Sequence, residues 1–498
     1  MVGFSRKATE CSSGLPYLPS CIPWVGNMLE MSGNLDRYHE WLTGHSLSRD
    51  GYPFALHLLG KNDVLYLSRP EHFEDVMKTH NANFNKSDSV RDTFDDFLGE
   101  NIVLINGERW LFQRKVLVNL FSARALREYV TPITQEKTMQ LQQVLKEKSD
   151  TDQIFDMQKL MNQFTLDIFA EIGFGCKLNL LTSGTEHLFE VAFDDANQIS
   201  CERFSKPTWL WKFQRYFNLG SERRLREAIG EMNDFILNVI KDSMKQIESF
   251  KLADTKDRPA FKNILTILLN NKQTITPTEV RNIALTGLEA GRGTTGATLV
   301  WLFHLVSLNP RVEKKLRAEI FAKFPVFKES DSYIPSYEEL NDLPYMEATI
   351  MEVLRLAPSV PTVTYHCTHD TVLRDNTFIP AGTDVFLHLY AAGRLSSVWG
   401  SDVESFTPER FLDAETGKLL KDSPAMYSFG GGPRSCIGKN MAMLEMKTTI
   451  ATVISRFTLI QEPGQDVRPT LDLTLTMKNP LMMRVAKYRE ERRCSKAF

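Results

Sequence analysis

Four glycines and one cysteine share the run FGGGPRSCIG, residues 429–438. Glycine lets the backbone turn sharply and approach a flat ligand closely. Apolar side chains then recur at helical spacing over residues 439–454, so Cys436 is expected just before a helix N-terminus. The free N–H groups and the dipole at such a terminus favour a thiolate and lower the cysteine pKa. We therefore interpret Cys436 as a metal ligand; the alternative is one more buried thiol in a glycine-rich turn.

The chain of 498 residues is expected to form one large unit that is mainly α with a minor β portion. An apolar fraction of 42% is enough for a sizeable core. Apolar residues from Met157 to Ile168 recur at helical spacing, and Thr151-Asp152 is the expected start signal of that helix. Strands are predicted by short apolar runs at residues 54–59, 64–67 and 383–389.

Charge and cysteine content exclude some classes of protein. The net charge of −3 gives no global reason to expect a nucleic-acid partner. The seven cysteines are odd in number, widely spaced and without a CxxC pair, which indicates a reducing compartment rather than a disulfide framework.

The cysteine run resembles the haem-thiolate loop of the cytochrome P450 family, with matching residues at Phe429, Gly432, Arg434, Cys436 and Gly438. The resemblance implies a cytochrome P450 fold that holds haem b (iron protoporphyrin IX) between a long distal helix and the cysteine loop. It implies that Cys436 binds the haem iron, that Phe429 packs near the sulfur, and that Arg434 pairs with a haem propionate.

Two further motifs agree with this family on the same side of the haem. Glu352 and Arg355 lie three residues apart in a predicted helix and can pair, and Arg410 follows in the run PERF at residues 408–411. The family has the same motifs, which implies a buried network that braces the haem loop. The alternative is an exposed ion pair, worth less than about 1 kcal/mol.

Trp110 and Arg114 form a WxxxR pattern, and their i, i+4 spacing points both donors the same way. The resemblance implies that both donate to a haem propionate; the alternative is a core tryptophan beside a surface arginine. The family's Lys or Arg for the second propionate is missing after Pro361, where Tyr365 and His366 stand and each can donate a hydrogen bond.

The run AGRGTT, residues 290–295, resembles the family's distal helix. The resemblance implies that Gly291 makes room for dioxygen and that the Thr294 hydroxyl takes part in proton delivery; Thr294 can also bond back to a carbonyl four residues earlier. Gly293 departs from the pattern, since relatives carry an acid there. Glu289 lies one turn before it, so we hypothesise that Glu289 replaces the missing acid; the alternative is a surface or salt-bridged Glu289.

The runs YAAGR, VWGSD and FTPER, between residues 390 and 410, resemble the eukaryotic branch of fatty-acid ω-hydroxylases and alkane hydroxylases. This implies a monooxygenase that inserts one oxygen atom from O2 into a C–H bond of a lipophilic substrate, a fatty acid at or near its terminal carbon. A separate NADPH-cytochrome reductase would supply electrons, docking near cations such as Lys439 and Lys447. Two alternatives stay open: a lipid-hydroperoxide isomerase or lyase of the same fold, and a non-catalytic haem-binding sensor.

The N-terminal part bears on localisation. We assign residues 1–50 to an N-terminal segment and residues 51–498 to a single haem-thiolate domain. GLPYLP at residues 14–19 resembles the proline-rich hinge that follows a membrane anchor in the family, although no apolar stretch here reaches 18 residues. The resemblance implies a monomer on the cytoplasmic face of the endoplasmic reticulum membrane; a soluble cytoplasmic protein is the alternative. Trp209, Trp211 and Phe213 are expected in a loop, packed or facing lipid.

Overall fold

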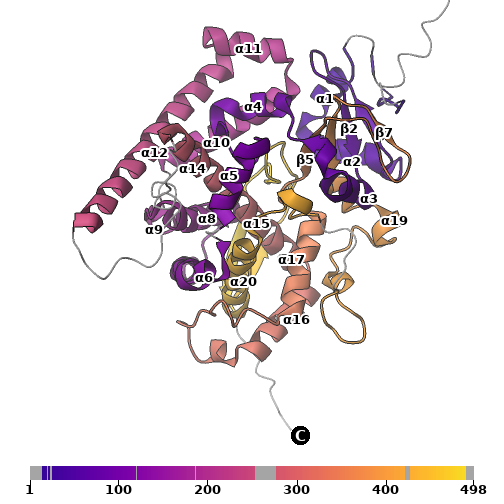
Figure 1. The fold of residues 1–498 in the computed structure, drawn as a ribbon. Coiled ribbons are helices and arrows are strands. Elements are labelled where there is room, and N and C mark those ends of the chain that lie inside the picture. The colour runs from indigo at the N-terminus through magenta and orange to yellow at the C-terminus, as the bar shows by residue number, and fades with distance from the viewer. Residues whose placement is uncertain are drawn as a thin grey trace, which may run out of the picture.

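The computed structural model describes residues 14–19, 21–22, 25–118, 121–184, 187–252, 276–420 and 427–488. Helices dominate, as predicted (Figure 1). The longer α-helices are α2 (Tyr38–Leu47), α4 (Asp88–Leu98), α5 (Gly107–Val118), α7 (Thr131–Asp150), α8 (Met157–Phe174), α10 (Leu188–Glu202), α11 (Thr208–Phe217), α12 (Gly220–Leu252), α14 (Pro277–Leu288), α15 (Thr294–Ser307), α16 (Pro310–Lys323), α17 (Pro344–Leu356) and α20 (Lys439–Arg456).

Short helical segments connect these helices. They are α1 (Met28–Gly33), η1 (Leu35–Arg37), α3 (Pro70–Glu74), η2 (Asp75–Thr79), η3 (Asn81–Asn83), α6 (Ala123–Ala125), η5 (Leu126–Val130), α9 (Leu180–Ser183), η6 (Arg203–Ser205), η7 (Glu289–Gly293), η8 (Pro325–Lys328), α18 (Leu389–Ala392), α19 (Ser396–Trp399), η9 (Pro408–Phe411) and η10 (Gly432–Arg434).

The main sheet lies to one side of the helices (Figure 1). Its strand order is β1-β2-β8-β5-β3, and β2 runs parallel to β8, with Leu65 opposite Val385. These strands span Phe54–Leu56 (β1), Val64–Leu67 (β2), Asp384–His388 (β8), Thr362–Cys367 (β5) and Phe84–Asn85 (β3). The three predicted strands are therefore confirmed. The smaller sheets contain β4 (Phe155–Asp156), β10 (Met482–Lys487) and β9 (Phe457–Gln461), and β6 (Thr371–Val372) and β7 (Phe378–Ile379).

The described part of the N-terminal segment packs against this sheet. The Leu18 N–H donates to the Ala55 carbonyl at 3.2 Å, and the Ala55 N–H donates to the Pro16 carbonyl at 2.9 Å. Trp41 and Leu42 of α2 are buried in one cluster with strand residues of β1 and β2. A domain boundary at residue 50 stays a prediction.

The predicted start of α8 is wrong by several residues. Thr151 is the C-cap of α7, and its hydroxyl donates to the Glu147 carbonyl at 2.8 Å. The chain then forms β4, and the Asp156 side chain caps α8 by accepting from the Gln158 N–H at 2.9 Å. Both cap candidates are residues that favour helix ends, so composition alone did not separate one helix end from the next helix start.

The distal helix is a single helical run in three segments, α14, η7 and α15. A capping box starts it, since Thr276 and Glu279 satisfy each other's backbone N–H groups, and Pro277 occupies the first turn. The middle segment, Glu289–Gly293, is a π-turn. Such turns inside α-helices are frequent at functional sites. α15 packs against α8, α17 and α20, which places the π-turn inside the body of the molecule.

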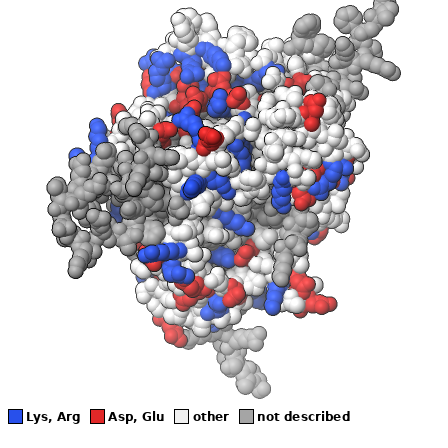
Figure 2. All heavy atoms as spheres, viewed as in Figure 1, with Lys and Arg blue, Asp and Glu red and all other residues white. Residues whose placement is uncertain are grey.

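Three surface and composition features follow. Among the described residues, no helix has the length and apolar character needed to cross a membrane. The five cysteines in the described ranges are free thiols. Basic and acidic side chains are interspersed on the face drawn in Figure 2.

Candidate functional site

The cysteine loop is held in a tight conformation by its own backbone. The Cys436 N–H donates to the Phe429 carbonyl at 2.8 Å, which closes the loop just before α20. Gly432 has a φ of +58°, and a Cβ there would lie 2.0 Å from the Met77 carbonyl oxygen. Glycine is therefore required at 432 for both conformation and space. The predicted position of Cys436 before a helix N-terminus is confirmed.

The predicted direction of the Cys436 pKa is wrong. Burial raises the pKa of the Cys436 thiol above its usual value, although the backbone N–H groups of Gly438 and Lys439 and the Arg114 guanidinium all act to lower it. The helix terminus thus lowers the Cys436 pKa, as expected, but desolvation of the thiolate raises the pKa by more. Coordination to a metal ion deprotonates a thiol outright, so a metal ion bound at Cys436 would outweigh this desolvation.

Arg434 of the loop lies together with Trp110 and Arg114 of α5. The Arg434 guanidinium stacks on the Trp110 ring at 4.5 Å and donates to Asn106 Oδ1 at 2.7 Å. Arg114 donates to the Ser435 carbonyl at 3.0 Å. The structure therefore brings the predicted propionate-binding residues together, and two of them also clamp the loop and the start of α5.

The sequence analysis missed Lys86, which joins this group from the end of β3. Its Nζ donates to the Thr364 carbonyl at 2.8 Å and lies 4.3 Å from the centre of the Tyr365 ring. Tyr365 lies in the stretch 364–366, where the resemblance predicts a cation, and Lys86 brings a charge from another element to this stretch. His366 does not take part, because its Nδ1 pairs with Asp384 Oδ1 at 2.8 Å. Lys86 lies 279 positions from Tyr365 in sequence, and no local motif marks it.

The chemistry of this group fits haem b. Lys86, Arg114 and Arg434 form no ion pair with a carboxylate of the described residues. Burial lowers the pKa of all three, that of Lys86 to about 7, with a further contribution from Arg434. Partly buried cations without anions are unfavourable, so the site favours negative charge. The two propionates of haem b would supply two such charges, held by Lys86, Arg114 and Arg434.

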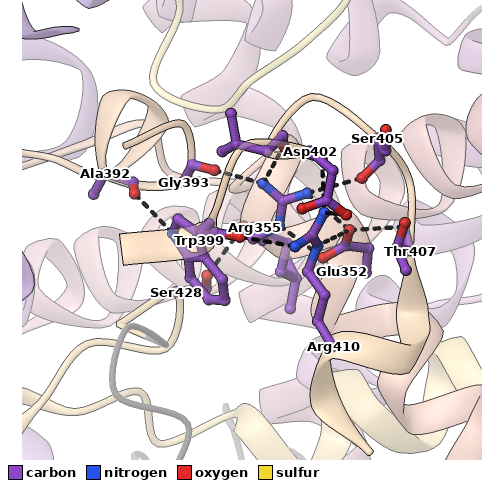
Figure 3. Close-up of polar contacts among 12 residues, drawn as sticks. Glu352, Arg355, Ala392, Gly393, Trp399, Asp402, Ser405, Thr407, Arg410 and Ser428 are labelled. Atoms are coloured by element: carbon purple, nitrogen blue, oxygen red, sulfur yellow. Dashed lines mark hydrogen bonds and ion pairs between the residues drawn. The ribbon is translucent and has the colours of Figure 1, made fainter. Parts of the chain in front are cut away.

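Behind the loop lies the predicted network of Glu352, Arg355 and Arg410 (Figure 3). Arg355 and Glu352 are fully buried and form two hydrogen bonds of 2.7 Å, and Arg355 also donates to the Gly393 and Val403 carbonyls at 2.6 and 2.7 Å. Arg410 lies 3.4 Å from Glu352 and donates to the Trp399 carbonyl at 2.8 Å. Because the carboxylate and its partners satisfy each other inside the core, the alternative of an exposed ion pair is wrong.

On the distal side, Thr294 follows the π-turn and lines a cavity. Its hydroxyl donates to the Ala290 carbonyl at 2.6 Å, the back-bond expected of a helix threonine. Gly291 faces the other way: a Cβ there would lie 2.1 Å from Phe169 Cδ2 of α8. The observed effect of Gly291 is thus close packing of the distal helix on α8, and room for dioxygen stays a prediction.

The Glu289 side chain folds back against Gly293. A Cβ on residue 293 would lie 3.3 Å from Glu289 Oε1 and 3.1 Å from Thr474 Cγ2. Glu289 lines the same cavity as Thr294, and its Oε1 is buried with no hydrogen-bond partner among the described residues. Burial, with Asp472 second, raises the pKa of Glu289 to about 8. Glu289 is therefore a neutral carboxylic acid at pH 7, and the alternative of a surface or salt-bridged residue is wrong.

The charged residue next to Glu289 points away from the cavity. Arg292 is buried and donates to both oxygens of Asp194, at 2.6 and 3.1 Å, with Glu190 at 3.7 Å. Asp472, on the opposite cavity wall, accepts from the Asn197 amide and from the Leu473 N–H, both at 2.6 Å. Among the carboxylates that line the cavity, Glu289 is thus the one with a buried oxygen that accepts no hydrogen bond from the described residues.

The cavity itself has a volume of about 280 Å³ and a largely apolar lining. Thr294 and Glu289 form part of one wall, and the segment from Leu471 to Thr474 forms another. Its apolar lining includes Val90, Phe94, Leu98, Leu104, Phe204, Val360, Val363, Phe386, Leu471 and Leu473. The size and lining are typical of a site for a small apolar ligand with a few polar contacts.

Two predicted surface features need correction. Lys447 is buried and pairs with Glu347 at 2.8 Å, so it is not a surface cation; Lys439 is exposed. The aromatic segment is not a loop but helix α11, which buries Trp211 against Arg203 and exposes Trp209 and Phe213. The sequence did carry a signal for this helix, because its aromatic residues recur at helical spacing, at positions 209, 213, 216 and 217.

The chain matches the family model "Cytochrome P450" over residues 16–485. It is 33% identical to cytochrome P450 94A1 of Vicia sativa over 462 residues, which cover 90% of this chain and 87% of the relative. It is 31% identical to cytochrome P450 94A2 of Vicia sativa, covering 97% of this chain and 93% of the relative. It is 30% identical to cytochrome P450 94B1 of Arabidopsis thaliana, covering 95% and 91%.

The fold, the cysteine loop and these relatives define a haem-thiolate protein. The chain belongs to the cytochrome P450 family. It is a monooxygenase whose cofactor is haem b, and it uses dioxygen, electrons from a reductase and a small-molecule substrate.

Proposed function

We propose that this cytochrome P450 hydroxylates a long-chain fatty acid at or near its terminal carbon. The observation that carries the proposal is the apolar cavity between Thr294 and the segment 471–474, which has few polar groups and suits an alkyl chain. The sequence resemblance to the fatty-acid and alkane hydroxylase branch agrees with it.

On the proximal side, Cys436 would ligate the haem iron, and Lys86, Arg114, Arg434 and Trp110 would hold the propionates. The bound haem supplies the activation of dioxygen, and a thiolate ligand favours cleavage of the O–O bond. The hydrogen bond from the Cys436 N–H to the Phe429 carbonyl holds the loop in its closed conformation. Phe429 and Gly438 complete the loop around the sulfur.

On the distal side, Glu289 would supply the protons that oxygen activation consumes. It is a carboxylic acid at pH 7, its Oε1 is free of donors, and it lines the cavity beside Thr294. The Thr294 hydroxyl would pass the proton on, which requires a brief exchange of its bond to the Ala290 carbonyl. Gly293 supports this role because the absence of a side chain there leaves room for the Glu289 carboxyl.

The test is turnover with a reductase, NADPH and dodecanoic acid under ¹⁸O2. We expect a hydroxy acid that carries one labelled oxygen atom. A protein with the carbon monoxide spectrum of a thiolate-ligated haem that forms no labelled product would contradict the proposal.

The role of Glu289 is tested by the fraction of electrons that ends in product. We expect a several-fold fall in Glu289→Gln, with electrons diverted to reduced oxygen species. Glu279→Gln is the matched control, because Glu279 caps the same helix and glutamine can keep that capping box. Equal coupling in Glu289→Gln and wild type would contradict the role.

Gly293 also supports a second candidate, a lipid-hydroperoxide isomerase or lyase, because such chemistry needs no acid at this position. Product formation from a fatty-acid hydroperoxide without reductant would favour it. Dependence of all turnover on reductant and dioxygen would exclude it.

We propose that the protein acts as a monomer on the cytoplasmic face of the endoplasmic reticulum membrane, and α11 supports membrane contact. Four aromatic side chains of this helix are more than half exposed, Trp209, Phe213, Tyr216 and Phe217. Exposed apolar surface of this kind is typical of a lipid or protein contact. Phe213→Ser with Phe217→Ser should reduce co-sedimentation with phosphatidylcholine vesicles, and unchanged sedimentation would contradict this contact.

A further inference from the structure

One wall of the cavity beside Thr294 is the tip of a hairpin, residues 468–478. The Thr470 N–H donates to the Thr476 carbonyl at 3.0 Å, which joins the two arms of the hairpin at the base of its tip. The tip contributes residues 471–474 to the lining of the cavity. We call residues 468–478 the wall hairpin.

The tip of the wall hairpin lies against the distal π-turn. A Cβ at Gly293 would lie 3.1 Å from Thr474 Cγ2, and Asp472 of the tip adds to burial in raising the pKa of Glu289. Because protein interiors are close-packed, a shift of the tip by a fraction of an ångström changes the shape of the cavity beside Thr294. The position of the tip therefore bears on where a bound chain meets the reaction centre.

The N-terminal segment contacts both arms of the wall hairpin. His39, in the first turn of α2, hydrogen bonds through Nε2 to the Thr470 carbonyl at 3.2 Å, directly before the tip. Three residues earlier, in η1, Asp36 pairs with Lys478 on the other arm and with Arg468 at 3.5 Å. The Asp36 pairs are exposed, and exposed pairs contribute little, so His39 is the firmer of the two links.

His39 acts as a fixed hydrogen-bond donor. It is buried, and it lines the cavity itself. Burial lowers the pKa of His39 to about 4, although the hydrogen bond to Thr470 acts in the other direction, so the ring is neutral at pH 7. A carbonyl oxygen only accepts, so the proton of the neutral ring is on Nε2, while Nδ1 is buried and has no hydrogen-bond partner among the described residues. The bond to Thr470 therefore ties the position of the hairpin to that of α2.

We infer that His39 is a positioning residue for the regiochemistry of the reaction: its hydrogen bond to the Thr470 carbonyl fixes the tip of the wall hairpin, and the tip sets which carbon of a bound alkyl chain lies beside Thr294. The inference rests on the proposed fatty-acid hydroxylation, because a flexible chain offers several neighbouring carbons to one site. The C–H bonds of a terminal methyl group are stronger than those of the methylene groups next to it. A loosened wall should therefore move oxidation from the terminal carbon to the carbons before it.

The test is the ratio of terminal to subterminal hydroxy acid that the holoprotein forms from dodecanoic acid with a reductase, NADPH and dioxygen. His39→Phe fills the space without a donor and should lower this ratio by up to roughly fivefold, the factor that one net hydrogen bond supports. His39→Gln keeps an N–H donor and should restore most of the ratio. A role of His39 in stability alone would lower the yield of all products and leave their ratio unchanged.

His39→Asn is a second variant without the link, because its amide is too short to reach the Thr470 carbonyl, and it should lower the ratio as His39→Phe does. Asp36→Asn breaks the exposed pairs of the same stretch and should change the ratio much less. Lys177→Met, in an exposed pair with Glu136, is the control and should match wild type.

The wild-type ratio in His39→Phe and His39→Asn with the carbon monoxide spectrum of thiolate-ligated haem would overturn the inference while leaving fatty-acid hydroxylation intact. If one of these variants does not bind haem, the ratio in the other decides. An equal effect of Asp36→Asn would contradict the assignment to His39. Absence of any hydroxy acid from correctly ligated wild type would instead overturn the proposed function, and the inference with it.

Discussion

The carboxyl group of Glu289 lies beside Gly293, with Oε1 only 3.3 Å from the point where a Cβ of residue 293 would stand. Glu289 and the departure from the family pattern at Gly293 thus belong to one arrangement. An acid one turn earlier in the π-turn reaches the space that the side chain of residue 293 would otherwise fill. The acid at 289 and the glycine at 293 depend on each other.

This dependence predicts the effect of restoring the family's acid. Gly293→Asp alone should lower thermal stability and coupling, because its side chain meets Thr474 and the Glu289 carboxyl in a buried site. The double variant with Gly293→Asp and Glu289→Gln should recover part of the lost thermal stability and coupling, because only one acid then remains at this place. Differential scanning calorimetry and product per NADPH measure the two effects. A double variant with lower thermal stability and lower coupling than either single variant would contradict this dependence between positions 289 and 293.

The raised pKa of Glu289 predicts a pH-dependent contribution to stability. The folded state keeps the proton up to about pH 8, whereas the unfolded chain loses it near the ordinary glutamate pKa of 4.5. The unfolded state therefore binds fewer protons between these values, and stability falls as pH rises through this window, by at most about 1.4 kcal/mol per pH unit. Asp472 and Asp194 strengthen the effect and Arg292 opposes it.

The measurement is urea unfolding of wild type and Glu289→Gln from pH 4 to 9. The stability of the variant relative to wild type should rise with pH across the window. A difference in the free energy of unfolding between the two proteins that is independent of pH would show that Glu289 does not hold a proton in the folded protein.

The buried pair of Glu352 and Arg355 predicts a large stability loss on breaking it. Glu352→Gln leaves the Arg355 charge without its counter-ion in a site with no solvent, which costs about 3–5 kcal/mol. Haem content of the purified protein should fall as well, because the network braces the segment before the cysteine loop. Glu128→Gln, in the exposed pair with Arg124, should cost less than about 0.5 kcal/mol. Similar losses in both variants would contradict a special role of the buried pair.

Local patterns predicted much of the fold. The strands at residues 54–67 and 384–388, the helix after Cys436 and the pair in α17 follow from period, capping and motif. The start of α8 was wrong because two capping residues, Thr151 and Asp156, compete within a few positions. Local sequence patterns predict the type of a helix or strand better than the residues at which it begins and ends.

The residues of the site also fall into those that a local motif predicted and those that only the fold brings together. Residues within one motif, such as Trp110 with Arg114, were found because spacing alone brings them together. Lys86 was missed because only the pairing of β3 with β5 brings it to Tyr365. The pKa of Cys436 was wrong in direction because desolvation depends on the whole surroundings of the loop, whereas the helix terminus is visible in the sequence.

Lys86 gives the last prediction. If it binds a haem propionate in place of the cation missing at Tyr365, then Lys86→Met removes one charge-assisted hydrogen bond to haem. Such a bond contributes about 1.5–3 kcal/mol, so haem should pass to an excess of apomyoglobin roughly ten to a hundred times faster. Lys86→Arg should retain haem, and Lys177→Met should behave as wild type. Equal rates of haem loss in Lys86→Met and wild type would contradict propionate binding by Lys86. The Lys86 amine would then serve only its contacts with the Thr364 carbonyl and the Tyr365 ring.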